Sequence, residues 1–218
     1  MSITVAGREI RKVHVIDDDK ASREGYALTV EEVDVETILQ EDKVENVADF
    51  FRHLDHLDAI VSDHHLKRVS SYFPINGAEL ASNCYDRGIP SLLVTRYEKS
   101  SVHEIRPFRN KIPVVLTPDK FNPESLVASL SECVDELMGN ISVGRKTWRT
   151  LIRIDGCDEY SVVVFIPSWN RSIAVDLRWS EFPDDIAKIL KPDLRIHASV
   201  NLDAEDISEL FFTAWEPK

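Results

Sequence analysis

Apolar and polar residues follow a repeating pattern over the first 140 residues, in which short apolar runs alternate with longer amphipathic stretches. Strands of a parallel sheet are buried on both faces and read as apolar runs, whereas the connecting helices read as amphipathic stretches. We therefore expect an α/β fold with a doubly wound, five-stranded parallel sheet. The predicted strands are residues 13–16, 33–39, 59–62, 91–95 and 114–117, and the predicted helices are residues 22–30, 47–54, 78–86, 101–109 and 123–138.

The pattern changes to that of strands from about residue 147 onward. Five strands are predicted, at TWRTLIRI, YSVVVFI, SIAVDL, LRIHASVNL and LFFTAWE, with one short helix in EFPDDIAKIL. We expect a first domain at residues 10–138, a linker at 139–146 and a small β-barrel-like domain, SH3-like or OB-like, at 147–218. All four tryptophans lie in the last region, either as core residues or, at Trp169 and Trp179, as anchors for a partner.

The composition fits a globular protein, since 43% of the 218 residues are hydrophobic and 29% are charged. A net charge of −12 opposes broad neutralisation of phosphates, so we expect no nucleic-acid partner. The three isolated cysteines predict free thiols, not disulfides or a zinc site. No apolar stretch approaches the ~20 residues that cross a bilayer, and we expect a cytoplasmic protein that does not bind membranes.

Polar side chains stand at the ends of four predicted strands. Asp17, Asp18 and Asp19 follow the first strand, and Asp63 follows the third. Thr95 ends the fourth strand, and Lys120 lies shortly after the fifth. Because the carboxyl ends of parallel strands share one edge of the sheet, we expect these groups to converge there.

Carboxylates that lie close together repel one another unless a cation neutralises them, and Mg²⁺ is held by such groups. Asp63 beside this ion would act as a carboxylate nucleophile toward a phosphoryl donor. Lys120 would balance the charge on the equatorial oxygens. The sequence therefore predicts an acyl phosphate on Asp63, with Mg²⁺ as the cofactor.

The ordered set of motifs VHVIDDD, AIVSD, NGAEL, SLLVT and VVLTPDKF resembles the receiver domain of response regulators, the CheY-like switch of two-component signalling. The resemblance covers about residues 10–138 and implies a flavodoxin-like fold. It implies that Asp17, Asp18, Asp63 and the backbone carbonyl of His65 hold the metal. Asp63 would be the phospho-acceptor, Thr95 would bond a phosphoryl oxygen and Lys120 would pair with it.

The same resemblance implies a phosphorylation-controlled signalling switch whose donor is a sensor histidine kinase or a phosphotransfer protein. The β-rich domain would act on an unidentified downstream protein through protein–protein interaction, and two copies would pair through the last helix of the receiver. Such a protein is not an enzyme beyond its own phosphoryl transfer and dephosphorylation.

The chain departs from the receiver pattern at several positions. Fourteen positions separate Asp63 from Gly77, so HHLKRVSSYFPIN carries an insertion, which we expect to gate access to the site. Phe121 replaces the proline that follows the lysine, Thr117 replaces an aromatic residue, and Arg96 follows Thr95 where a small residue is common. These departures concern the transmission of a signal more than the attachment of phosphate.

Two other functions remain open on the sequence. A haloacid-dehalogenase-like phosphatase would use Asp17 as nucleophile and Asp19 as acid, although Lys20 and Ala21 break its motif. A phosphorylation-independent pseudo-receiver would keep the fold and respond to a partner. The aspartate run also has a purely structural interpretation as a helix cap. For His53, His56, His64 and His65, which could suggest a metal site, we expect solvated side chains.

Overall fold

The computed structural model describes residues 1–67, 72–96 and 99–217. The chain forms two compact units. The first, here called the α/β unit, comprises Met1–Ser100 and Lys111–Asn140. The second, the β unit, comprises Ser101–Asn110 and Ile141–Lys218. None of the described helices is long and apolar enough to cross a membrane.

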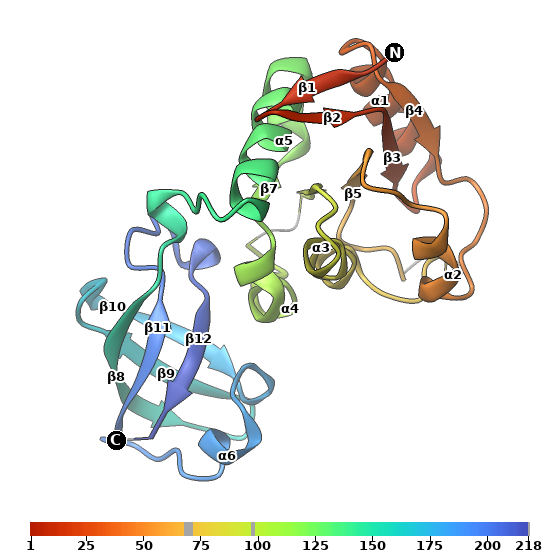
Figure 1. Ribbon diagram of the computed structural model, residues 1–218. Helices are drawn as coiled ribbons and strands as arrows, with labels where there is room; N and C mark the ends of the chain where they lie inside the picture. Colours follow the sequence, from red (N-terminus) through yellow and green to blue (C-terminus); the bar gives the residue numbers. More distant parts are fainter. Residues whose placement is uncertain (68–71, 97–98, 218) are drawn as a thin grey trace. The chain divides into compact units, whose positions relative to one another are not determined.

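The α/β unit is built on a five-stranded sheet in which all neighbouring strands are parallel (Figure 1). The strand order is β4-β3-β5-β6-β7, the order of flavodoxin-like folds. The predicted α/β class and doubly wound sheet are therefore confirmed. The strands are β3 (Lys12–Ile16), β4 (Glu36–Leu39), β5 (Asp58–Ser62), β6 (Ser91–Val94) and β7 (Val114–Leu116).

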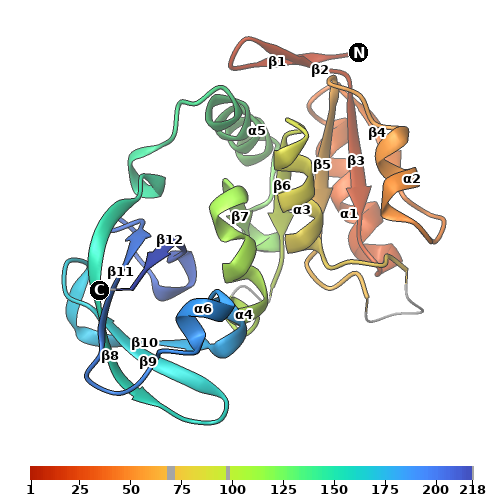
Figure 2. The same cartoon turned by 60° about the horizontal axis from the view of Figure 1, so that its bottom comes forward.

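Helices cover both faces of this sheet (Figure 2). On one face, α1 (Lys20–Glu31) and α5 (Pro123–Leu137) pack on the valines of β3 and β5. On the other face, α2 (Val47–Arg52) and α3 (Gly77–Asp86) pack on Ile16 and Ile60. Asn122 caps α5 through a reciprocal pair of hydrogen bonds with Ser125, which explains why this helix begins where the sequence predicts.

A two-stranded hairpin precedes the sheet and was not predicted. It consists of β1 (Ile3–Val5) and β2 (Arg8–Ile10), joined by a tight turn at Ala6 and Gly7, both with positive φ. Val5 and Ile10 are buried in the core beside α5. The guanidinium of Arg8 donates hydrogen bonds to the backbone carbonyls of His56 and Gly88. Strands of three residues carry too little alternation to stand out in a sequence.

The β unit contains one antiparallel sheet of order β10-β9-β8-β11-β12. Alternate residues of β8, β9, β10 and β11 face a core that includes Ile152, Val164 and Ile196. The β-rich character of this part of the chain is confirmed, whereas its SH3-like or OB-like classification stays a prediction. The strands are β8 (Trp148–Cys157), β9 (Ser161–Ile166), β10 (Asn170–Arg178), β11 (Arg195–Val200) and β12 (Phe212–Glu216), and the short helices are η3 (Val143–Arg145), η4 (Trp179–Glu181), α6 (Asp184–Ala187) and η5 (Ile207–Glu209).

The chain between β6 and β7 belongs largely to the β unit. The predicted helix at 101–109 is instead a single α-helical turn, α4 (Val102–Ile105), followed by the 3-10 helix η1 (Arg106–Lys111). Pro107 lacks the N–H that a continuing α-helix would need, which accounts for the change. The sequence-based division placed this stretch within the first domain. In the structure Ser101–Asn110 is grouped with the C-terminal sheet, and Arg106 of this stretch forms an ion pair with Glu181 in the β unit.

Candidate functional site

Three carboxylates meet at the carboxyl edge of the α/β unit's sheet. Asp17 and Asp18 follow β3, and Asp63 follows β5, its parallel neighbour. The amide of Asp63 donates a 2.9 Å hydrogen bond to the carbonyl of Ile16, which ties the two strand ends together. Carboxylate oxygens of the three aspartates lie within 4.8 Å of one another. β3 and β5 also flank the point where the strand order reverses, the usual ligand position in open α/β sheets.

The electrostatics of this cluster fit a divalent cation. Asp17 is only 4% exposed, and burial, together with the charges of Asp63 and Asp18, raises the pKa of its carboxyl to about 7. A hydrogen bond of 2.8 Å from the amide of Asp19 to Asp17 Oδ1 opposes that rise. Mg²⁺ is a hard cation that prefers oxygen ligands, and each of the three side chains in this cluster offers carboxylate oxygens. The residues present therefore fit the predicted metal.

Asp19 has a different role from the other two residues of the aspartate run. It is the N-cap of α1, and its carboxylate accepts hydrogen bonds from the amide and hydroxyl of Ser22 at 2.9 and 2.8 Å. These bonds lower the pKa of Asp19. A general acid must hold a proton near neutral pH, so this environment opposes the acid role that the phosphatase interpretation gives to Asp19.

The loop after Asp63 is fixed by the start of α3. The amide of His65 donates a 2.8 Å hydrogen bond to Asp63 Oδ2, and the amide of Gly77 donates one of 2.8 Å to the carbonyl of His64. Gly77 lies so close that a Cβ placed on it would be 1.8 Å from the carbonyl oxygen of Asp63. The metal-binding role of the His65 carbonyl stays a prediction.

The four histidines differ in their exposure. His64 and His65 are buried, so the expectation that they are solvated is wrong. Leu66, which follows them, packs into the core with α2 and α3 and keeps this part of the loop inside the unit. His53 and His56 are exposed, as expected.

Thr95 and Lys120 follow the next two strands along the same edge. Thr95 is fully buried directly after β6, and its amide donates a 2.8 Å hydrogen bond to the carbonyl of Leu116 in β7. Lys120 ends the 3-10 turn η2 (Pro118–Lys120) after β7 and is exposed. Their roles toward a phosphoryl group stay predictions.

Two further residues hold the site, and the sequence interpretation did not single them out. Arg23 is buried, donates a hydrogen bond to the backbone carbonyl of Asp17, and lies 5.6 Å from the ring centroid of Tyr72. The hydroxyl of Tyr72 in turn donates to the carbonyl of Gln40. The signal for Arg23 was present, because it shares a buried helical stripe with Ala27 and Val30, where a charge requires a partner.

The insertion is anchored beside the site at both ends. Leu66, Tyr72 and Phe73 pack into the core next to α2 and α3. Its residues 68–71 lie outside the described part of the chain, so the expected gating of access stays a prediction.

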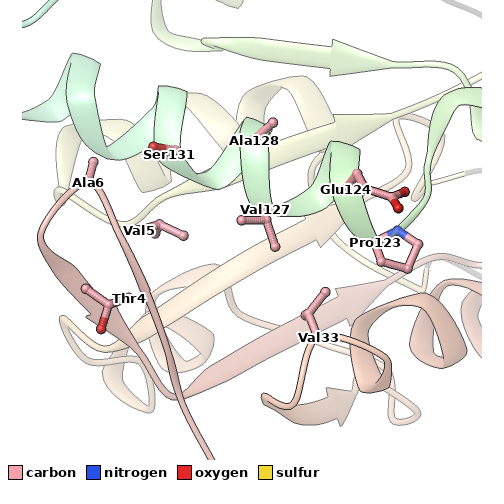
Figure 3. Close-up of a pocket in the computed structure, with 9 residues that line it drawn as sticks. All are labelled: Thr4, Val5, Ala6, Val33, Pro123, Glu124, Val127, Ala128 and Ser131. Atoms are coloured by element: carbon pink, nitrogen blue, oxygen red, sulfur yellow. The ribbon is translucent and has the colours of Figure 1, made fainter.

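An apolar groove elsewhere in the α/β unit does not offer comparable chemistry (Figure 3). It has a volume of about 680 Å³ and is formed by the N-terminal hairpin, Val33 and the first half of α5. Glu124 is its one ionisable lining residue. The acidic cluster is therefore the better candidate for the functional site.

The fold and the acidic cluster define the α/β unit as a flavodoxin-like domain with a three-carboxylate site at the point where the strand order reverses, the switch point of the sheet. No protein-family model and no curated protein matches the chain. Solved response-regulator receiver structures are similar to part of it.

One is a receiver domain protein (CheY-like) from Methanospirillum hungatei, with 19% identity over 60% of this chain and 98% of that one and a TM-score of 0.45. A putative response regulator from Chloroflexus aurantiacus has 18% identity, covers 57% of this chain and 98% of its own, and has a TM-score of 0.44. A receiver domain protein from Clostridium thermocellum has 11% identity, covers 58% and 96%, and also has a TM-score of 0.44.

Proposed function

We propose that this protein is a response regulator, a signalling switch controlled by phosphorylation of Asp63. The observation that carries the proposal is the approach of the Asp17, Asp18 and Asp63 carboxylates to within 4.8 Å at the switch point of a flavodoxin-like sheet. A structural cap would need one aspartate, and Asp19 already supplies it. Three converging acids on two strand ends instead match a site that handles a cation and a phosphoryl group.

In the proposed reaction, a carboxylate oxygen of Asp63 attacks the phosphorus of the donor. A new P–O bond forms while the bond from phosphorus to the leaving group breaks, and that group departs with the bonding electron pair. With a phosphohistidine donor the broken bond is P–N, and with acetyl phosphate the leaving group is acetate. The hydrogen bond from the His65 amide to Asp63 Oδ2 holds the carboxylate in one orientation for this attack.

Asp17, Asp18 and Asp63 would hold Mg²⁺, which would neutralise their charge and that of the incoming phosphoryl oxygens. Thr95 would donate to a phosphoryl oxygen, and the ammonium group of Lys120 would pair with it. Water later attacks the phosphorus, the Asp63–phosphorus bond breaks, and inorganic phosphate leaves. The carboxylate is then restored, so the protein resets itself with water as the only further reactant.

The first test is phosphorylation of the full chain by acetyl phosphate in the presence of Mg²⁺. We expect intact mass spectrometry to show one added phosphoryl group on the wild type and none on Asp63→Asn, because the amide oxygen is a poor nucleophile. Asp19→Asn is the matched control, since asparagine also caps helices and this residue lies outside the cluster. It should retain the adduct.

The same samples separate the alternatives. Steady hydrolysis of p-nitrophenyl phosphate that depends on Asp17 and Asp19 would support a phosphatase and contradict the switch. A wild type that gains no mass, with or without Mg²⁺, would leave a pseudo-receiver whose output depends on a partner. A sensor histidine kinase or phosphotransfer protein is the proposed donor, and the proposed output is protein–protein interaction through the β unit.

A further inference from the structure

Ten residues of the β6–β7 connection are a structural part of the β unit. Ser101–Asn110 is grouped with Ile141–Lys218, although the chain on both sides of it belongs to the α/β unit. It begins six positions after Thr95, the predicted phosphoryl-sensing residue. We call this stretch, which is distinct from the insertion after Asp63, the inserted segment.

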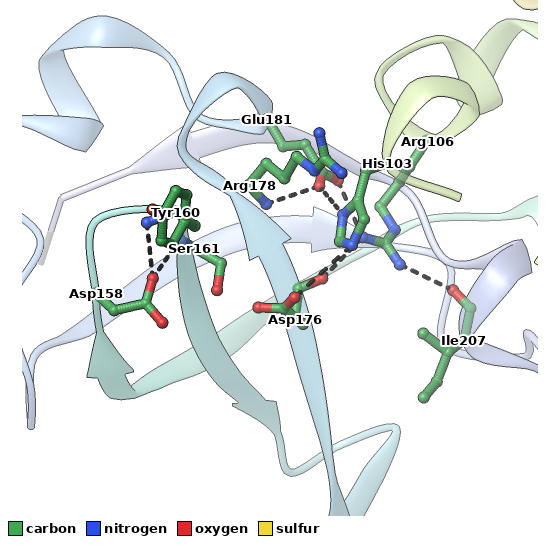
Figure 4. Close-up of polar contacts among 9 residues, drawn as sticks. All are labelled: His103, Arg106, Asp158, Tyr160, Ser161, Asp176, Arg178, Glu181 and Ile207. Atoms are coloured by element: carbon green, nitrogen blue, oxygen red, sulfur yellow. Dashed lines mark hydrogen bonds and ion pairs between the residues drawn. The ribbon is translucent and has the colours of Figure 1, made fainter. Parts of the chain in front are cut away.

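The side chain of Arg106 joins the inserted segment to edge strand β10, to Glu181 and to the η5 turn of the β unit (Figure 4). It is 2% exposed. Nη1 donates to Glu181 Oε2 at 3.0 Å and to the backbone carbonyl of Asp176, on edge strand β10, at 3.1 Å. Nη2 donates to the carbonyl of Ile207 at 3.4 Å, in the η5 turn that precedes the other edge strand, β12. One guanidinium therefore binds both edge strand β10 and the η5 turn.

Glu181 is the buried counter-charge of this contact. Its side chain is 4% exposed, Oε2 accepts from Arg106, and Oε1 lies 2.7 Å from His103 Nδ1. Oε1 also accepts a 2.8 Å hydrogen bond from the amide of Arg178. Both oxygens of the carboxylate are thus engaged, two of the three contacts coming from the inserted segment. Removing one partner of a buried ion pair leaves an uncompensated charge, so the pair binds the segment firmly.

A second arginine holds the other end of the inserted segment. Arg145, which is buried in η3, donates to the backbone carbonyls of Arg109 and Asn110 at 3.1 and 3.0 Å. Its guanidinium also lies 5.2 Å from the ring centroid of Phe211 in the β unit. The region predicted as a linker therefore contains a residue that fixes the segment, which the β unit holds at His103, at Arg106 and at its last two residues.

We propose that the inserted segment transmits the state of the phosphorylation site to the β unit, through the buried Arg106–Glu181 ion pair beside edge strand β10. The inference rests on the proposed phosphorylation of Asp63. The chain between Thr95 and the segment is short, and its reach is limited to about 3.5 Å per residue. Only residues 96–100 connect Thr95 to the segment, so a displacement of Thr95 toward a phosphoryl group would reach the β unit through residues that already contact it.

The distribution of tryptophan supplies a selective optical probe. Trp148, Trp169, Trp179 and Trp215 all belong to the β unit, and residues 1–147 contain none. Trp179 lies in η4 with Glu181, and its indole Nε1 donates a 2.9 Å hydrogen bond to the carbonyl of Asp158. A change in tryptophan emission therefore reports on the β unit, whereas the phosphoryl adduct on Asp63 is counted separately by mass.

The experiment uses the full chain with Mg²⁺ and beryllofluoride, which mimics a phosphoryl group on a carboxylate. We expect wild-type tryptophan emission to shift on titration and Asp63→Asn to show no shift. Arg106→Gln and the double variant Arg106→Gln/Glu181→Gln, which leaves no lone buried charge, should lose the shift while acetyl phosphate still phosphorylates them. Arg149→Gln is the matched control, because Arg149 forms an exposed ion pair with Glu216 in the same unit. It should retain the shift.

Each outcome decides one of the two proposals. An absent mass adduct on the wild type would overturn the proposed function. A normal adduct without an emission shift in the wild type, or with an unchanged shift in the double variant, would overturn the transmission role alone. If circular dichroism shows that the variants do not fold, amide hydrogen exchange of residues 101–110 in the wild type decides. We expect beryllofluoride to change their protection, and unchanged protection would count against the proposal.

Discussion

Gly77→Ala is expected to lower the free energy of unfolding by about 3 kcal/mol and to abolish phosphorylation of Asp63. A Cβ at this position would lie 1.8 Å from the carbonyl oxygen of Asp63 and 2.9 Å from Leu93 Cδ1. The nearer contact is with backbone, so a rotamer change cannot relieve it. Either α3 must move away from β5, or the loop that carries Asp63 must shift, and both disturb the acidic cluster. Urea unfolding followed at 222 nm and the acetyl phosphate assay measure the two effects.

Gly25→Ala is the matched control for Gly77→Ala. Gly25 lies inside α1 and a Cβ there would meet no atom within 4 Å. Alanine at this position should therefore raise the free energy of unfolding by about 0.5–1 kcal/mol through its helix propensity. Equal stability of the two variants, with normal phosphorylation of Gly77→Ala, would contradict the close packing of α3 against Asp63.

Asp17→Asn is expected to stabilise the metal-free protein at pH 8 by about 2 kcal/mol or more. In the folded state the pKa of Asp17 is raised to about 7, above its ordinary value of 3.8. An acid of this kind supports folding fully below its unfolded-state pKa and loses that contribution as the pH rises through the folded-state pKa. Asparagine removes the buried charge and can still accept the hydrogen bond from the Asp19 amide. The gain should shrink as the pH falls from 8 to 5.

In the presence of Mg²⁺ the wild type should be more stable than Asp17→Asn, the reverse of the order without the metal. The wild type should gain stability on addition of the ion, by an amount that grows with its concentration, whereas Asp17→Asn should gain little. Asp42→Asn, which changes an exposed aspartate outside the cluster, should behave as the wild type in both conditions. The measurement is urea unfolding in EDTA and in Mg²⁺ at pH 5 and pH 8. If Asp17→Asn were less stable than the wild type in EDTA at pH 8, the burial of the Asp17 carboxylate and its repulsion by the neighbouring aspartates would be contradicted.

The sequence was sufficient to predict the parallel sheet and the position of its acidic residues. Buried parallel strands leave an unmistakable run of apolar residues, as in AIVSD, and the residue that follows such a run must lie at the carboxyl edge. The pattern of residues was not sufficient to distinguish the roles of Asp17 and Asp19. Residues 17 and 19 are both aspartates, so their side chains are identical. Which of them faces the cluster depends on the backbone conformation where α1 begins. Only the backbone geometry shows that Asp19 caps the helix.

The segment between β6 and β7 was harder to interpret for a different reason. Its residues carry the spacing of a helix, and Ile105 is buried as such a pattern predicts. The partner of Arg106, however, is Glu181, seventy-five positions later, and a contact of that sequence separation leaves no local periodicity. Buried ion pairs between distant segments are therefore the class of feature that inspection of a single sequence misses.

The discontinuous composition of the β unit restricts how this protein can exchange parts in evolution. Proteins with two domains can diversify by recombination, in which one domain is replaced by another at the boundary between them. A crossover near residue 140 would transfer Ile141–Lys218 without the ten residues that complete the unit, Ser101–Asn110. Arg106 would then lose its partner Glu181. The two parts of this chain are thus expected to be inherited together, with substitutions at position 106 and position 181 occurring jointly.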